Sequence, residues 1–198
     1  SSNSLSICPG QSATLTASGA STYIWSPSTG LSSYTGSSVS ASPTIATTYT
    51  VTGTSSNGCI GLPISATVTV NQVPNVQVSA SSSSICSNQS VTLTATGADS
   101  YIWSPSNSLS SLTGGIVTAT PAASTTYTVT GTTSNGCVGT FTIPITVNPL
   151  PTIQISPLNP TICSGDFVTM TASGADTYNW DPLNGLSSTT GATVIGTP

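Results

Sequence analysis

The sequence contains no lysine, arginine or histidine, and its four acidic residues are all aspartates. Charged residues make up 2% of the 198 positions, against about 25% in an ordinary globular protein. Nucleic-acid binding requires cationic side chains that displace counterions, and a basic membrane-surface patch requires them as well. The composition therefore excludes a nucleic-acid partner and a basic membrane-binding surface.

The usual catalytic groups are missing too. Without His, Lys or Glu, the chain lacks the common general bases, Schiff-base amines and imidazole metal ligands. Serine hydroxyls are abundant, but only an aspartate is present to activate one. We therefore expect no enzyme activity and no cofactor.

Long apolar runs are also absent. No segment approaches the roughly 20 apolar residues of a membrane-spanning helix, and no basic segment marks a signal peptide, so we expect any anchor or export signal to lie outside these residues. The chain instead holds 38 Ser and 37 Thr, with 36% hydrophobic residues and a mean hydropathy of +0.22. Because disordered chains combine low hydrophobicity with high net charge, this composition predicts a folded, soluble chain rich in β-strands.

Internal repetition decides the predicted architecture. The segment ICPGQSATLTASGASTYIWSPSTGLSS begins at Ile7 and recurs with few changes from Ile85 and from Ile162. A second segment, TTYTVTGTSSNGC, ends at Cys59 and recurs in a copy that ends at Cys137. We expect three immunoglobulin-like repeats, spanning 1–72 (first strand missing), 73–149 (complete) and 150–198 (closing strands missing), joined by the short proline-containing segments 71–74 and 148–151. On this interpretation the sequence is a window on a longer periodic chain.

Alternation of apolar and polar residues predicts short strands within each repeat, such as Val91, Leu93 and Ala95 facing inward. Asn-Gly at 57–58 and 135–136 predicts a hairpin turn. Six or seven strands around one tryptophan are typical of a β-sandwich of about 77 residues per repeat, somewhat smaller than an immunoglobulin domain. The predicted core residues are Trp25, Trp103, Trp180, Tyr49 and Tyr127.

The repeats resemble the immunoglobulin-like and PKD-like repeats of giant cell-surface proteins in Bacteroidota. The segments that carry the resemblance are ICPGQSATLTASG, TYIWSPSTGLSS and TTYTVTGTSSNGC, and it covers the whole chain. It implies tandem domains of a gliding-adhesin-like protein exported by the type IX secretion system. Such modules serve as spacers, stalks and adhesive units.

The five cysteines are the strongest chemical signal. Cys8 and Cys86 precede a strand, while Cys59 and Cys137 follow the Asn-Gly turn. No CxxC pair or histidine accompanies them, so disulfides in an oxidising compartment are favoured over a metal site. Cys163 is expected to pair outside this segment.

Two connectivities remain open for the other four cysteines. The simpler one pairs cysteines of the same repeat, Cys8 with Cys59 and Cys86 with Cys137. However, the two positions lie at opposite ends of an immunoglobulin sandwich, about 20 Å apart along a strand, whereas disulfide Cα atoms lie about 4.4–6.8 Å apart. The second connectivity joins Cys8 to Cys137 across the joint between repeats.

Other candidate sites are weaker. The recurring aromatic pairs suggest sugar binding, but one pair per repeat on one strand face favours core packing. Tyr34 has no aromatic counterpart in the other repeats and is expected to be exposed. Four aspartates are too few and too scattered for a convincing Ca²⁺ site. A single N-glycosylation sequon begins at Asn88. The pairs are Tyr23 with Trp25, Tyr101 with Trp103, and Tyr178 with Trp180; the aspartates are Asp99, Asp166, Asp176 and Asp181.

These observations favour a structural extracellular protein at the cell surface, a filament or the stalk of an adhesin. Its partners would be neighbouring repeats and like chains in a fibre, because a surface with few charges repels its neighbours weakly. The alternative is an adhesive module that binds glycan or a partner cell.

Overall fold

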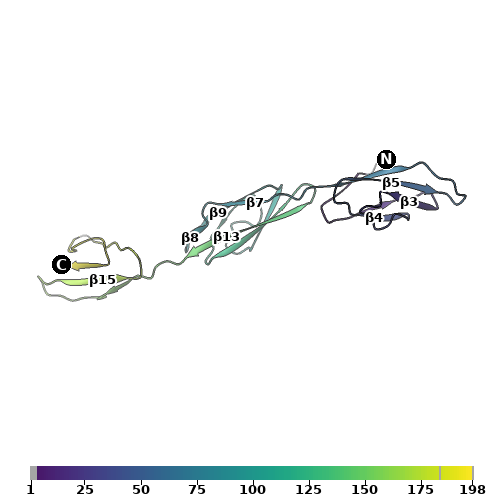
Figure 1. Cartoon of the computed structure of the whole chain (residues 1–198). Helices are drawn as coiled ribbons and strands as arrows, with labels where there is room; N and C mark the ends of the chain where they lie inside the picture. The colour runs from purple at the N-terminus through teal and green to yellow at the C-terminus, as the bar shows by residue number, and fades with distance from the viewer. Residues whose placement is uncertain (1–3, 183, 198) are drawn as a thin grey trace. The chain divides into compact units, whose positions relative to one another are not determined.

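The computed structural model describes residues 4–182 and 184–197, and every regular element in these ranges is a β-strand. The chain forms two compact units, Ser1–Val147 and Asn148–Pro198 (Figure 1). The first unit contains the first two predicted repeats, and the second unit contains the third. The all-β immunoglobulin-like fold is confirmed, while the repeat boundaries stay a prediction.

The described residues of the first repeat form two sheets. One has the strand order β1-β6-β5-β3, with β1 parallel to β6, and the other pairs β2 with β4. The parallel partnership of the first and last strands beside antiparallel neighbours is the arrangement that closes one sheet of an immunoglobulin sandwich. The strands are β1 (Ser4–Ile7), β2 (Ala13–Thr16), β3 (Thr22–Ser26), β4 (Ser38–Ala41), β5 (Thr47–Thr54) and β6 (Ile64–Val70).

Among the residues that the structure describes, the second repeat has the same two sheets and one strand more. Its sheets have the orders β10-β12-β13-β8 and β11-β9-β7. The additional strand β7 lies along β9, as Figure 1 shows. The strands are β7 (Gln77–Ala80), β8 (Ser84–Cys86), β9 (Val91–Thr96), β10 (Ser100–Ser104), β11 (Ile116–Ala119), β12 (Thr125–Thr132) and β13 (Val138–Asn148).

The second unit contains one three-stranded antiparallel sheet in the order β14-β15-β16. It corresponds to the sheet β7-β9-β11 of the second repeat, because its central strand β15 carries the equivalent sequence VTMTAS. The strands are β14 (Gln154–Ser156), β15 (Val168–Ser173) and β16 (Thr193–Gly196).

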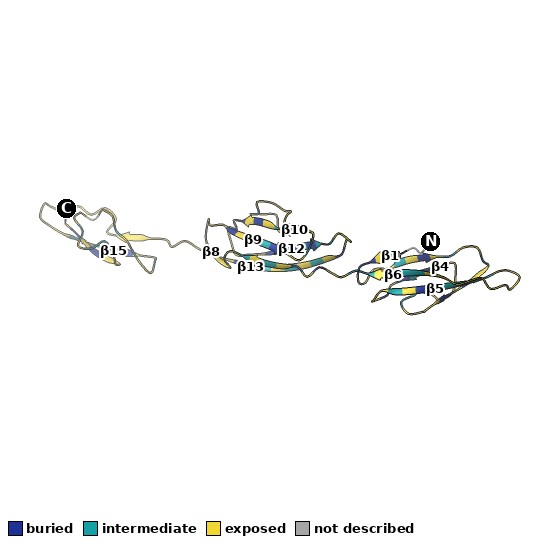
Figure 2. Cartoon of the chain, turned by 90° about the horizontal axis from the view of Figure 1, so that it is seen from above, coloured by how far each residue is buried: buried dark blue, intermediate teal, exposed yellow. Residues whose placement is uncertain are grey.

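Alternation of buried and exposed positions along the strands builds the cores (Figure 2). In β9, Val91, Leu93 and Ala95 are buried, and the threonines between them are exposed or half-buried. Trp103 and Tyr127 lie in the same core, as predicted. Trp25 and Tyr49 occupy the matching places in the core of the first repeat.

Trp180 differs from the other two tryptophans because its side chain is only half-buried. Within the described part of the second unit, it lies outside the three strands of the sheet. Its indole nitrogen still donates a hydrogen bond to the Gly191 carbonyl at 2.8 Å, as Trp103 does to Gly114 at 2.9 Å. The loop that accepts the indole hydrogen bond is therefore the same in both repeats. Trp180 and Trp103 differ in how much of the indole ring is covered by other residues.

Hydroxyl side chains replace charge on the outer strand faces. Thr48 and Thr67 are opposite each other on β5 and β6, and their hydroxyl oxygens are 2.9 Å apart. Thr50 and Ser65 form the next such pair, at 3.0 Å. Cross-strand hydroxyl pairs stabilise a sheet in the way opposite charges do elsewhere.

Candidate functional site: the cysteine turns

Two turns present the cysteines. Cys8 follows β1 directly; its amide donates to the Gln11 side-chain oxygen at 3.2 Å, and its carbonyl accepts from the Gln11 amide at 3.0 Å. Cys86 is held in the same way by Gln89, with both distances 3.1 Å. The two cysteines are thus presented by turns of the same construction.

The second turn type connects the last two strands of a repeat. The Cys137 amide donates to the Thr133 hydroxyl at 3.1 Å, and its carbonyl accepts from the Thr133 amide at 2.9 Å. Ser55 holds Cys59 with the same two bonds in the first repeat. Gly136 has a φ of 80°, which supports the prediction that Asn-Gly forms a tight turn here.

A disulfide joins Cys8 to Cys137, with the two Cα atoms 5.4 Å apart. Of the two connectivities left open by the sequence, the structure therefore contains the one that crosses from one repeat to the next. Both bonded cysteines are buried, whereas Cys59, Cys86 and Cys163 are exposed free thiols. The same-repeat pairs Cys8–Cys59 and Cys86–Cys137 are absent, because Cys8 and Cys137 are bonded to each other.

Asp99 supports the turn that carries Cys137. Its carboxylate accepts a hydrogen bond of 2.6 Å from the backbone amide of Ser134. Sequence reasoning missed this role, although Asp176 holds the equivalent place in the third repeat and was a usable signal; Ser21 holds it in the first repeat. Within the ranges 4–182 and 184–197, no group of three or more His, Cys, Asp or Glu residues is placed to hold a metal ion.

The recurring aromatic pairs are engaged in their own repeats. Trp25 is buried, and its indole nitrogen donates to the Gly36 carbonyl at 2.9 Å. The Tyr23 hydroxyl donates to the Ala20 carbonyl and accepts from the Ala20 amide, at 2.9 and 2.7 Å. These contacts fix a loop beside the strand and use the polar atoms that a bound sugar would need.

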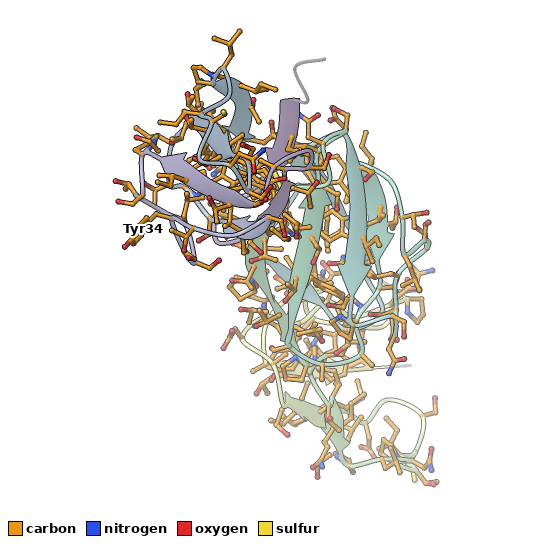
Figure 3. The ribbon with its side chains drawn as sticks, turned by 90° about the vertical axis from the view of Figure 1, so that its right-hand side faces the viewer. Tyr34 is labelled. Atoms are coloured by element: carbon orange, nitrogen blue, oxygen red, sulfur yellow. A yellow bond between two sulfur atoms is a disulfide. The ribbon has the colours of Figure 1, made fainter. Side chains whose placement is uncertain are left out.

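Two further candidate positions lie on the surface. The Tyr34 side chain is 60% exposed and projects from its loop (Figure 3), as expected from its lack of aromatic counterparts. Asn88, the sequon residue, is exposed in a turn at a φ of 70°. Glycines at 10 and 165 hold its place in the other repeats, so Asn88 serves the left-handed turn whether or not it is modified.

No protein-family model matches the chain, and no curated protein matches it. Among solved structures, a three-domain fragment of titin, I67–I69, is 12% identical and covers 98% of this chain and 85% of that chain, with a TM-score of 0.44. Residues 4–182 and 184–197 contain no helix that could span a membrane.

Two further solved structures are also similar. A fragment of intimin, solved with the intimin-binding domain of its translocated receptor, is 18% identical and covers 73% of this chain and 60% of that chain, with a TM-score of 0.40. A Ca²⁺-stabilised, ice-binding adhesin of an Antarctic bacterium is 16% identical and covers 85% of this chain and 55% of that chain, with a TM-score of 0.39. At these identities the likeness concerns the immunoglobulin-like fold alone.

Proposed function

We propose that this chain is a structural extracellular protein whose tandem immunoglobulin-like repeats, 1–72, 73–149 and 150–198, form a filament or the stalk of a cell-surface adhesin. The observation that carries the proposal is the Cys8–Cys137 disulfide, which links two repeats rather than two strands of one repeat. The consequence of this disulfide is mechanical, because tension between the repeats passes through the disulfide and not through the folded strands between Cys8 and Cys137.

The disulfide and the nearly uncharged surface support the same role. Structural disulfides persist in oxidising environments, which favours a location outside the cytosol. The surface has almost no charge, and a formal net charge of −4 over 198 residues gives like chains little electrostatic reason to stay apart. Neighbouring repeats and like chains in a fibre are therefore the proposed partners. The resemblance to Bacteroidota surface proteins suggests export by the type IX system.

Antibody labelling on intact cells tests the proposal. An antibody raised against the 198-residue chain should label extracellular fibres on unpermeabilised cells of the source organism. Labelling that appears only after permeabilisation would contradict an extracellular role. Saturable binding of the purified chain to polysaccharide, with no fibre labelled, would instead support the adhesive alternative.

A further inference from the structure

The four-stranded sheet of each repeat in the first unit has one side packed on the core and one side that points away from it. In β5, Tyr49 and Val51 pack into the core of the first repeat. Successive side chains of a strand point to opposite sides of its sheet, so Thr48, Thr50 and Thr52 point away from that core. Strand β12 has the same sequence as β5, TTYTVTGT. Both repeats therefore carry a row of threonines on the outward side of this sheet.

Hydroxyl side chains also occupy facing positions on the neighbouring strands. Thr50 is opposite Ser65 on β6, and the equivalent Thr128 is opposite Thr142 on β13. We call the outward side of β3, β5 and β6, together with the matching side of β10, β12 and β13, the hydroxyl face. The hydroxyl face thus recurs in the two repeats on equivalent strands.

An exposed isoleucine lies at the same place of the hydroxyl face in each repeat. Ile24 on β3 is 59% exposed, and Ile102 on β10 is 60% exposed. Each lies opposite a threonine of the central strand, Thr52 and Thr130 respectively. Because covering an aliphatic side chain removes apolar surface from water, these isoleucines favour contact with a partner. The hydroxyl face therefore combines hydrogen-bonding groups with an exposed aliphatic side chain in each repeat.

The hydroxyl face carries no charge, since all four aspartates of the chain lie outside its strands. A second copy that approaches this face therefore meets no like charge. A hydroxyl group both donates and accepts hydrogen bonds, so a surface of hydroxyls is complementary to a copy of itself, whereas a surface of like charges is not. Thr48 and Thr67 show such pairing within one repeat, with hydroxyl oxygens 2.9 Å apart. This pair uses one of its two hydroxyl protons and keeps the other for a partner.

The hydroxyl face is also the larger outer surface of the sandwich. In the first repeat, β5 and β6 have eight and seven residues, whereas β2 and β4 of the other sheet have four each. At about 4.8 Å between strands and 3.3 Å per residue, three strands of five residues cover roughly 240 Å². A stable interface takes about 800 Å² from each partner. Contact through one repeat is therefore weak, and association strengthens when several repeats engage at once.

We propose that the hydroxyl face binds the hydroxyl face of a second copy of this chain, so that like chains associate side by side. The proposal rests on the proposed function, in which like chains are the partners, and it names the surface through which they meet. Hydrogen bonds between hydroxyl groups and burial of the two isoleucines hold the chains together. A pairing of identical surfaces of this kind has two-fold symmetry.

Sedimentation equilibrium of the complete 198-residue chain tests the proposal. The three free thiols are alkylated first, so that no new disulfide can join two chains. The weight-average mass should rise with protein concentration toward about 1 mM. The double variant Thr50→Lys with Thr128→Lys places one positive charge on the hydroxyl face of each repeat. It should weaken association at least about tenfold, because like charges then meet across the contact.

The matched control carries the same two charges on the other sheet. Thr14 and Thr92 are exposed and occupy equivalent positions on β2 and β9. Thr14→Lys with Thr92→Lys changes the net charge of the chain by the same amount and should leave association unchanged. Equal weakening by the two double variants would overturn the proposal, because the charge would then act irrespective of the surface that bears it.

Complementary charges identify the surfaces that touch. Thr50→Asp with Thr128→Asp should stay monomeric alone, but an equal mixture with the lysine variant of the same positions should associate at least as strongly as the parent chain at low ionic strength. Recovery in the mixture also shows that both variants are folded. A mixture that stays monomeric while the parent associates would show that the hydroxyl faces do not meet.

An uncharged variant tests the apolar contribution. Ile24→Ser with Ile102→Ser keeps the net charge and should weaken association several-fold, because less apolar surface is buried. A parent chain whose mass does not change up to about 1 mM would also overturn the proposal. Association of the purified chain does not depend on where the protein is located in the cell. A failure here is therefore distinguishable from a failure of antibody labelling, which tests the extracellular role.

Discussion

Cys8 and Cys137 are 129 positions apart in the sequence, and their Cα atoms lie 5.4 Å apart in the fold. The bond therefore encloses most of two repeats in one covalent loop. Force applied at the two ends of the chain enters this loop at one sulfur and leaves at the other. The strands between Cys8 and Cys137 are shielded from extension while the bond is intact, whereas β1 and β13 lie outside the loop.

Single-molecule pulling should reveal this shielding. In the oxidised chain, unfolding inside the loop adds no length, whereas after reduction the 129-residue span can extend by up to about 450 Å at roughly 3.5 Å per residue. Cys8→Ser should behave like the reduced protein under oxidising conditions. Cys86→Ser is the matched control, because Cys86 sits in the same kind of turn but is a free thiol. Equal extension of the oxidised chain and Cys8→Ser would contradict the shielding.

Local sequence signals predicted the strand interiors well. Val91, Leu93 and Ala95 alternate because a half-buried strand requires it, and Trp103 recurs because each sandwich needs a large central side chain. These features depend on neighbours only a few residues away. The same holds for the tight turn that ends at Cys137.

Other features could not be deduced from the sequence. The Cys8–Cys137 bond depends on how two repeat ends meet, and the cysteine positions in the sequence are compatible with two connectivities. The extent to which Trp180 is buried depends on which strands pack against its indole ring. The seating of the opening strands gave one signal that went unused: glycines recur at 19, 97 and 174, and an added Cβ at 97 or 174 would meet a neighbouring backbone carbonyl.

Tyr49 should make the first repeat sensitive to alkali. Its side chain is fully buried and its hydroxyl donates to the Thr29 carbonyl at 2.8 Å. Burial raises the pKa of the Tyr49 phenol above its ordinary value, and a hydrogen bond with Thr47 partly opposes the shift. The unfolded chain therefore ionises first, so the stabilising contribution is complete below about pH 10 and is lost as the pH rises through the folded-state pKa.

Tyr49→Phe separates the two contributions of this residue. At neutral pH, losing the hydrogen bond should lower the free energy of unfolding by about 1 kcal/mol. Above about pH 10, the variant should lose stability less steeply than the parent chain. Urea unfolding at a series of pH values measures both effects. Tyr34→Phe is the control, since that side chain is exposed; a slope equal to the parent's in Tyr49→Phe would show that Tyr49 is not the group responsible.

Asp99 should determine how firmly the Cys137 turn is held. Asp99→Ala removes the carboxylate that accepts from the Ser134 amide, and we expect a loss of roughly 1 kcal/mol in the unfolding free energy of the second repeat. Hydrogen exchange at residues 133–137 should accelerate more than exchange in β9. Uniform acceleration across the repeat would show that the carboxylate supports the whole sandwich and not the turn alone.

Gly97 and Gly19 form a natural matched pair for testing how the opening strand is seated. Both have a φ of +95°, so an alanine at either position meets the same backbone strain, of about 1 kcal/mol. Only Gly97→Ala also drives a methyl group into the Asn75 carbonyl, which should raise the total cost to roughly 3 kcal/mol. Amide exchange should therefore accelerate strongly in β9 of Gly97→Ala and only slightly in β2 of Gly19→Ala. If the two variants lose equal stability, backbone strain alone accounts for both glycines, and the close approach of the Asn75 carbonyl contributes nothing to holding β7 against β9.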